Sequence, residues 1–391
     1  MRLAVALGER DPDSLDFYAG PEEVVAAVRG EPPSLRAIGL AAGALSARVS
    51  AERLDPAEPS RARALSADLA AMMARVDLLT GTRLPYDKES VAFFGVAPAP
   101  IDERRLAQIR SQIADVVGHG GRLVDRYTTF AARFTVPADR LPDVMRAAID
   151  ECRRRTVAHV ALPAAEQVTL ELVRDKPWSA FSRYLGDGQS VIQINTDFRF
   201  TVDQALQVAC HEGYPGHHTR NTLMAPRRDA SARPPERSIQ LMFTPEGLES
   251  EASAMLAADV AFSTDERVRF VRERLFPLAG LDAAGAQRHV DVERLVGELQ
   301  MVQADVARRY LDGELEFARA VTQLEDRALV PHAEALVKYI NQYRTYVTTY
   351  TAGRQILAAR LAACAGPNPA DDVRWRCFQR ETLPRGAETI P

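Results

Sequence analysis

The sequence predicts a mainly α-helical fold with one small antiparallel β-sheet. Long stretches rich in Ala, Leu and Arg carry apolar residues at spacings of three and four, which is typical of helices with one buried face. Strand-like alternation of apolar and polar residues is concentrated in residues 166–197. At 391 residues, the chain is long enough for a large core or for two lobes that share one cleft.

The first 165 residues predict an N-terminal helical lobe. Its expected helices cover residues 34–54, 60–80, 103–127 and 139–156. Gly118, Gly120 and Gly121 mark a turn or a break near the end of the third helix. Because no repeat and no clear linker interrupts the chain, we expect a single unit over residues 1–391, with residues 166–391 as its second lobe.

The expected sheet and the helix after it lie at the start of the second lobe. Its strands are expected at residues 168–173, 179–184 and 190–195, with the last as an edge strand that ends near Asn195. Thr201 and Gln204 then show the capping-box pattern that begins a helix. Later helices are expected at residues 246–263, 266–278, 285–311, 315–341 and 346–364. A Pro- and Arg-rich loop is expected at 225–237, and an irregular tail after 366.

Charge and composition exclude several classes of partner. The net charge of −4 gives no reason to expect nucleic acid or an anionic membrane as a partner. No apolar run approaches the roughly 18 residues of a membrane span, and the N-terminal run is too short for a secretory signal, so we expect a soluble cytoplasmic protein. Four cysteines without a CxxC pair do not indicate a disulfide scaffold. We expect Cys210 to be a packed thiol rather than a metal ligand.

Residues 211–218, HEGYPGHH, hold three of the seven histidines of the chain. Zinc hydrolases bind the ion through two imidazoles and a third ligand from another element, and they leave one position for water. A Glu directly after the first His points beside the metal and can take a proton from that water. The pattern indicates a zinc site with His211 as a ligand and Glu212 as the general base. The alternative is a Gly-Pro loop after a helix, with histidines on its surface.

The spacing within this motif requires a distorted helix. The usual HExxH pattern puts two histidines four residues apart on one helix face, but Pro215 occupies that position here. On an ideal helix His217 would be rotated by about 240° and raised by about 9 Å from His211, and His218 would be raised by about 10.5 Å. Pro215, with a glycine on either side of the Tyr-Pro pair, favours a widened turn that absorbs two residues. We therefore predict His217 as the second ligand and keep His218 as the alternative.

The motif resembles the HExxPGHH signature of a bacterial family of candidate metallopeptidases, filed as domain of unknown function 885. That family is zincin-like and distantly similar to Taq-type carboxypeptidases, whose HExxH helix is followed by a Glu ligand on the next helix. Weaker similarities follow the family order along nearly the whole chain, at residues 16–21 (DFYAGP), 194–196 (INT), 246–248 (EGL) and 350–353 (YTAG). The resemblance implies a zincin-like helical fold, with the small sheet beside the metal-binding helix, and the activity of a zinc metallopeptidase.

The resemblance also implies the remaining site residues. Glu246 matches the Glu of the family's EGW segment and is expected to be the third zinc ligand. An alternative role for Glu249 or Glu251, which does not come from the resemblance, is that of an outer partner that orients an imidazole. Tyr350 begins the Y-x-x-G segment, and its phenol is expected to stabilise an oxyanion, with half-buried packing as the alternative.

The predicted function is a zinc-dependent hydrolase that cleaves short peptides or related amides through a zinc-activated water, with one Zn²⁺ per chain. The chain departs from the family pattern at residues 246–253, 305–309 and 344–347, which puts the substrate class in doubt. Two alternatives therefore stay open: a metal-dependent enzyme acting on a non-peptide small molecule, and a non-catalytic metal-binding protein. The strand ending near Asn195 is expected to pair with an extended substrate. The oligomeric state and any requirement for chain ends are left open.

Overall fold

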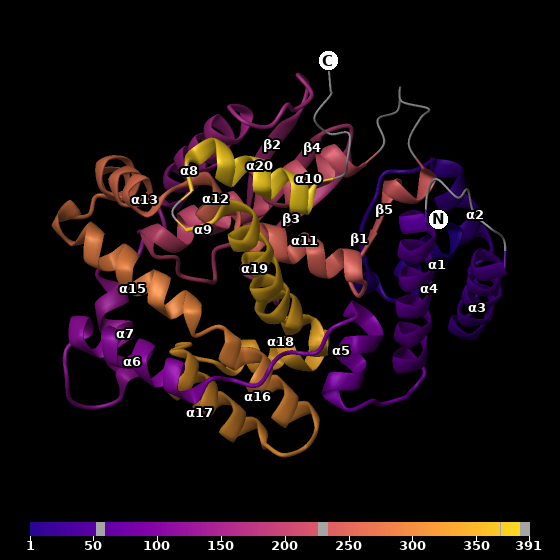
Figure 1. Cartoon of the computed structure of the whole chain (residues 1–391), viewed down its shortest axis with the longest axis horizontal. Helices are drawn as coiled ribbons and strands as arrows, with labels where there is room; N and C mark the ends of the chain where they lie inside the picture. The colour runs from indigo at the N-terminus through magenta and orange to yellow at the C-terminus, as the bar shows by residue number, and fades with distance from the viewer. Residues whose placement is uncertain (52–58, 226–233, 368, 384–391) are drawn as a thin grey trace.

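The computed structural model describes residues 1–51, 59–225, 234–367 and 369–383, and it confirms the mainly helical fold (Figure 1). The first helices are α1 (Arg2–Arg10), α2 (Glu22–Gly30), α3 (Leu35–Ala51), α4 (Pro59–Leu79), α5 (Tyr86–Phe94), α6 (Glu103–Val117), α7 (Leu123–Ala132) and α8 (Leu141–Val157). The strands are β1 (Leu15–Tyr18), β2 (Gln167–Val173), β3 (Ala180–Gly186), β4 (Gln189–Asn195) and β5 (Ile239–Leu241). Most of the loop predicted at 225–237 lies outside the described residues.

The later helices surround the sheet and complete the larger body of the molecule. They are α9 (Val202–Glu212), α10 (His217–Met224), α11 (Pro245–Met255), α12 (Ala257–Ala261), α13 (Thr264–Phe270), α14 (Phe276–Ala279), α15 (Ala286–Glu298), α16 (Met301–Leu311), α17 (Phe317–Ala328), α18 (Glu334–Tyr343), α19 (Arg354–Ala365) and α20 (Asp371–Thr382). Figure 1 shows α1–α4 gathered at one end of the molecule, with α11 running from the larger body toward β5.

The helices predicted from apolar spacing overlap those observed, but the segments predicted at 285–311 and 315–341 are each divided into two helices, and α1, α2 and α5 were not predicted. The segment predicted at 103–127 is divided into α6 and α7, because Gly118, Gly120 and Gly121 adopt positive φ angles that end a helix. The irregular tail predicted after 366 is wrong. Helix α20 forms there because Trp375 and Phe378 are buried in the main core.

The three-stranded sheet is mixed rather than purely antiparallel. Its order is β2-β4-β3, with β2 parallel and β3 antiparallel to β4. The strand that ends at Asn195 is therefore central, and its prediction as an edge strand is wrong. Strand β3 is an edge of the sheet instead, because the β3–β4 hairpin places β4 between β3 and β2. A second sheet pairs β1 with β5 antiparallel, and it brings the N-terminal segment beside residues 239–241.

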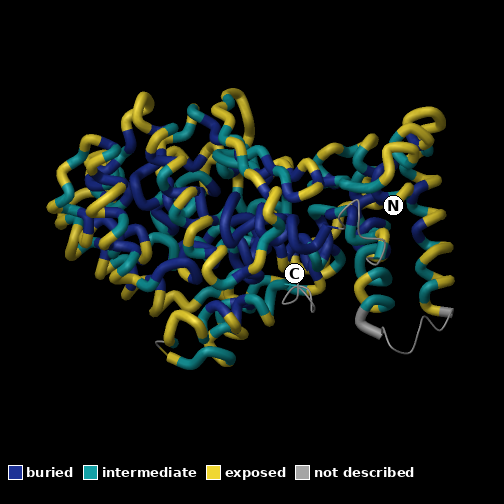
Figure 2. Tube along the Cα trace, turned by 90° about the horizontal axis from the view of Figure 1, so that it is seen from above, coloured by how far each residue is buried: buried dark blue, intermediate teal, exposed yellow. Residues whose placement is uncertain are grey.

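Buried apolar side chains form two main clusters. The larger one includes Ile109, Leu206 and Trp375 and occupies the larger body. A smaller one, which includes Leu7 and Ile38, lies among the N-terminal helices. Figure 2 shows the buried trace concentrated in the larger body. Helices on both sides of residue 165 thus share one core.

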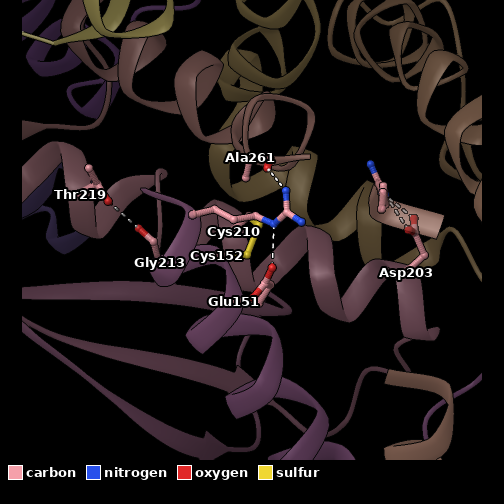
Figure 3. The surroundings of a disulfide bond; sticks show 9 residues. Glu151, Cys152, Asp203, Cys210, Gly213, Thr219 and Ala261 are labelled. Carbon is pink, nitrogen blue, oxygen red and sulfur yellow. Dashed lines mark hydrogen bonds and ion pairs between the residues drawn. A yellow bond between two sulfur atoms is a disulfide. The ribbon is translucent and has the colours of Figure 1, made fainter. Parts of the chain in front are cut away.

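All four cysteines of the chain are paired in disulfides. Cys152 of α8 is bonded to Cys210 of α9 (Figure 3), and Cys364 of α19 is bonded to Cys377 of α20. The prediction of a packed thiol at Cys210 is therefore wrong. Spacing along the chain did not reveal this pairing, because 58 residues separate the first pair. Within the described residues, no helix combines the length and the apolar character needed to cross a membrane.

Candidate metal centre

Helix α9 is interrupted where the motif predicts a distortion. The helix begins with the predicted capping box between Thr201 and Gln204 and ends at Glu212, and α10 begins at His217. Across the gap, Gly216 N–H donates to the carbonyl of Cys210, and Thr219 N–H donates to that of Gly213. Both bonds span six residues instead of four. The prediction of a turn that absorbs two extra residues is confirmed.

Gly216 allows this turn to fold back on the end of α9. A Cβ atom at this position would lie 1.8 Å from the carbonyl oxygen of His211 and 2.5 Å from that of Cys210. Neither backbone atom could move aside without disturbing the helix end. A residue with a side chain therefore cannot replace Gly216 without changing the path of the loop.

The turn brings His211 and His217 together with Glu251 of α11. One ligand atom from each of the three residues lies within 4.8 Å of the others. The Nε2 atom of His211 is 3.5 Å from Glu251 Oε2, and the Nε2 atom of His217 is 3.4 Å from Glu251 Oε1. These distances exceed the usual length of an N–H···O hydrogen bond.

These three residues fit a metal ion by the chemistry of their donor atoms. Glu251 Oε2 is buried and has no hydrogen-bond partner, which is costly for a carboxylate oxygen. A cation between the two Nε2 atoms and this oxygen would satisfy all three. Two imidazoles and one carboxylate are also a donor set of catalytic zinc sites.

Hydrogen bonds outside the group orient its side chains. His217 Nδ1 lies 3.3 Å from Ser250 Oγ, and the ring of His211 bonds to the backbone carbonyl of Ala254. Tyr346 donates its hydroxyl to Glu251 Oε1 at 3.0 Å. The Nε2 atoms are thus left to face the shared point. Such outer bonds fix the ring orientation and tautomer of metal-binding histidines.

The surroundings shift the pKa values of the two histidines in opposite directions. Burial lowers the pKa of His211 to about 4, with a further contribution from the nearby His217. Burial also lowers the pKa of His217, but the charge and hydrogen bond of Glu251 outweigh it and raise that pKa to about 9. In the metal-free site, Glu251 therefore holds a proton on His217, and a metal ion would have to displace it.

Glu212 lies beside this group without belonging to it. Its carboxylate is 6 % exposed, with Oε1 3.9 Å from His211 Nε2, and it accepts a hydrogen bond from the backbone of Ser182 on β3. Burial raises the pKa of Glu212 to about 7. This position suits the predicted general base, and its catalytic role stays a prediction.

The structure places Glu251, rather than the predicted Glu246, with the two histidines. Glu246 lies in the first turn of α11, where its carboxylate is 3.5 Å from Arg220 and 3.3 Å from Arg237. Glu249 is largely exposed. Glu251 lies more than one helical turn after Glu246, on a different face of α11. The face that carries Glu251 is the one that points at α9 and α10. A sequence signal existed, because small residues that suit a buried face flank Glu251 at 250 and 252–254.

Tyr350 lies near the carboxylate of Glu251, but a different tyrosine, Tyr346, makes the direct contact with that carboxylate. The Tyr350 hydroxyl is 3.0 Å from that of Tyr339, and its ring centroid is 5.6 Å from that of Tyr346. Burial and the charge of Glu251 raise the pKa of Tyr350. Tyr346 makes the direct bond to Glu251, and sequence reasoning missed it. The oxyanion role of Tyr350 stays a prediction.

Asp16 is a second residue of the surroundings to which the sequence assigned no role. It lies on β1, within the segment 16–21 that resembles the family. Burial raises its pKa to about 6, and the charges of His217 and Glu251 act on it in opposite directions. Strand β1 thus brings an acid from the N-terminal segment into the electrostatic field of the site.

His218, the alternative ligand, faces away from this group. Its Nδ1 atom is 2.8 Å from Ser190 Oγ, and its Nε2 atom is 2.9 Å from Glu166. Both ring nitrogens are therefore engaged by other side chains. The geometry favours His217 over His218 as the histidine of the site.

Comparisons with known proteins support the fold. No protein-family model and no curated protein matches the chain. A solved structure described as a candidate lipoprotein from Colwellia psychrerythraea is similar to it, with a TM-score of 0.56 and 14% identity over 87% of this chain. The chain spans 65% of the length of that protein. At this identity the likeness concerns the fold alone.

Two further structures align over most of the chain at lower similarity. A candidate lipoprotein of unknown function from Shewanella oneidensis has a TM-score of 0.44 and 13% identity, covering 91% of this chain and 75% of its own. Metallocarboxypeptidase 1 of Trypanosoma cruzi has a TM-score of 0.40 and 13% identity, covering 99% and 88%. Superpositions this loose carry no argument about the site, which rests on the geometry of the chain itself.

Proposed function

We propose that the chain is a zinc-dependent hydrolase that cleaves short peptides or related amides. The observation that carries this proposal is the meeting of His211, His217 and Glu251 around an unpartnered carboxylate oxygen. Three protein ligands leave a position open for water, as in catalytic rather than structural zinc sites. When bound, zinc would lower the pKa of that water toward neutrality.

Glu212 would move the proton in this reaction. It is next to a ligand in the sequence, its carboxylate is buried, and it is not part of the group that could hold the metal. The bond from Ser182 holds the carboxylate toward β3. Glu212 would accept a proton from the attacking water and deliver it to the leaving amine.

Strand β3, rather than the strand that ends at Asn195, would align an extended substrate. It is an edge of its sheet, and Ser182 within it reaches Glu212. An edge strand offers backbone donors and acceptors to a peptide in extended form. A peptide bond held along β3 would lie beside the proposed base.

We further infer that the chain folds in an oxidising compartment. Disulfides are rare in cytosolic proteins and common in secreted or periplasmic ones. The two disulfides therefore argue against the cytoplasmic location that we expected from the N-terminal sequence.

The test of the proposed function is Glu212→Gln, which keeps the size of the side chain and removes the base. We expect the variant to retain zinc and its melting temperature, and to lose at least about 10²-fold in turnover. Zinc content, melting temperature and hydrolysis of a pool of short synthetic peptides would be measured side by side. The matched control is Glu249→Gln, an exposed acid on α11. Equal turnover of Glu212→Gln and wild type would remove the general base.

A further inference from the structure

Residues 211–218, which carry the two candidate histidine ligands, form the metal loop. A buried acid, Glu166, accepts hydrogen bonds from two side chains of this loop. The side chain of Glu166 is fully buried in the turn before β2. Its Oε2 atom accepts from the Tyr214 hydroxyl at 2.5 Å and from His218 Nε2 at 2.9 Å. Its Oε1 atom accepts from Arg153 of α8, at 2.8 Å from Nε and 2.6 Å from the terminal nitrogen. One carboxylate thus joins three side chains.

The two loop residues bound by Glu166 flank His217. Tyr214 precedes it by three residues and His218 follows it directly, and their ring centroids are 4.7 Å apart. Because a carboxylate accepts hydrogen bonds and does not donate them, the Nε2–H of His218 donates to Glu166. The other ring nitrogen, Nδ1, is hydrogen-bonded to Ser190 Oγ of β4 at 2.8 Å. Both donors to Glu166 are therefore held in one orientation.

His217 depends on the path of this loop more than His211 does. His211 lies within the last turn of α9, whose position follows from the helix. His217 is the first residue of α10, and no side chain caps that helix end. Its distance from His211 is set by residues 213–216. Hydrogen bonds that hold residues 214 and 218 in place would therefore fix the distance between His217 and His211.

Consecutive residues of α8 support the two histidines. Cys152 is bonded to Cys210, directly before His211, and Arg153 holds Glu166, which binds the residue directly after His217. The same helix therefore supports the metal group from both sides.

We propose that Glu166 is a positioning residue of the metal centre, which sets the place of the His217 ring by binding Tyr214 and His218 together. The proposal rests on the zinc site proposed above. A simpler role, in which the buried pair of Glu166 and Arg153 only stabilises the fold, predicts a lower melting temperature but an unchanged metal site.

The test is metal binding by Glu166→Gln, which keeps the shape and removes the charge. Affinity for zinc would be measured by chelator competition, and the coordination geometry by the visible absorption of bound cobalt(II), at a temperature where circular dichroism shows a folded chain. We expect zinc affinity to fall by about 10–100-fold, the range for loss of an outer partner, together with an altered cobalt spectrum. Tyr214→Phe, which removes the hydroxyl that donates to Glu166 and keeps the bond from His218, should change both measurements in the same direction by a smaller amount.

The matched control is Asp203→Asn. Asp203 is also a buried, arginine-paired acid, and it lies on the helix that carries His211. We expect it to lower the melting temperature and to leave zinc affinity and the cobalt spectrum unchanged. Wild-type affinity and spectrum in folded Glu166→Gln would overturn the positioning role; if that variant does not fold, the same result in Tyr214→Phe would do so. A wild-type chain that binds neither ion would instead refute the proposed zinc site.

Discussion

The two ends of helix α9 hold buried carboxylates in opposite situations. At the amino end, both oxygens of Asp203 accept hydrogen bonds from Arg267, at 2.7 and 2.6 Å. At the carboxyl end, Glu251 lies against two histidines, and no arginine or lysine of the described residues forms an ion pair with it. The amino end thus contains its own cation. The carboxyl end has three donor groups that could hold a cation, and one of their oxygens has no hydrogen-bond partner.

Residue types alone do not distinguish these two ends. The amino end also has a histidine, His289, and a second buried acid, Glu293. His289 Nε2 accepts the backbone N–H of Asp203, and Glu293 accepts from Tyr127 and Gln204. Burial raises the pKa of Glu293 to about 8, so the acid is protonated at neutral pH. Pairing and protonation remove the charge of the two acids there and leave only a neutral ring nitrogen of the cluster, His289 Nδ1, without a hydrogen-bond partner, whereas the unpartnered atom at the carboxyl end belongs to a carboxylate.

The largest expected effect is at the carboxyl end, with Glu251→Gln. This change removes the only carboxylate among the three donor groups. Loss of an outer partner can lower metal affinity by up to about 100-fold, and we expect the loss of a ligand to lower zinc affinity by more than that. Turnover should be lost with the metal. Isothermal titration with zinc and elemental analysis check the result. Glu246→Gln is the control and should bind zinc like the wild type; the reverse order of effects would restore Glu246 as the third ligand.

At the amino end, Asp203→Asn should affect stability instead of the metal. The change removes the buried partner of Arg267 and leaves it only the half-exposed Asp259 at 3.3 Å. Breaking a buried pair costs up to about 3–5 kcal/mol of unfolding free energy. Denaturant unfolding measures this loss, and elemental analysis should still find one zinc per chain. Loss of zinc from the folded variant would show that the two ends are coupled through α9.

Tyr350→Phe tests how far the carboxyl-end site extends. If the phenol donates to the oxyanion, kcat should fall by about 10–10³-fold with unchanged zinc content, as for the loss of one oxyanion donor. Steady-state kinetics on the peptide pool, with metal analysis, would measure this. Tyr339→Phe removes the hydroxyl that bonds to Tyr350 and is the matched control. Unchanged turnover of the Tyr350 variant would leave this tyrosine a packing residue.

At the amino end we also expect the stability of the fold to depend on pH. Because the folded pKa of Glu293 is raised from 4.5 to about 8, the folded chain binds one more proton than the unfolded chain between these values. Stability should therefore fall as pH rises through this window, by at most about 1.4 kcal/mol per pH unit.

Glu293→Gln should remove this contribution and flatten the dependence. Unfolding free energies of both proteins from pH 5 to pH 8 provide the comparison. Glu298→Gln, at the partly exposed end of the same helix, controls for the loss of an acid from α15. Parallel curves for Glu293→Gln and wild type would show that Glu293 is ionised in the folded chain.

Local features of the site could be predicted, and the choice of its third member could not. The distortion at 213–216 follows from the sterics of Pro215, four residues after His211, and from the glycine beside it. The choice between Glu246 and Glu251 depends on which face of α11 meets α9 and α10, and residue spacing within α11 does not contain that information. The resemblance of short segments indicated helix α11, but it named Glu246, which lies more than one turn before the Glu251 that the structure places with the two histidines.

The sequence by itself determined the helical class, the capping box at Thr201, the two-residue expansion after His211 and the pairing of His211 with His217. Each depends on forces that act within a few residues, such as apolar period, capping and proline sterics. Only the tertiary structure decided the order of the sheet, the two disulfides, the place of Glu251 and the contact of Glu166 with the metal loop. These depend on how separate elements pack, and segments distant in the sequence meet only when the common core buries their apolar faces together.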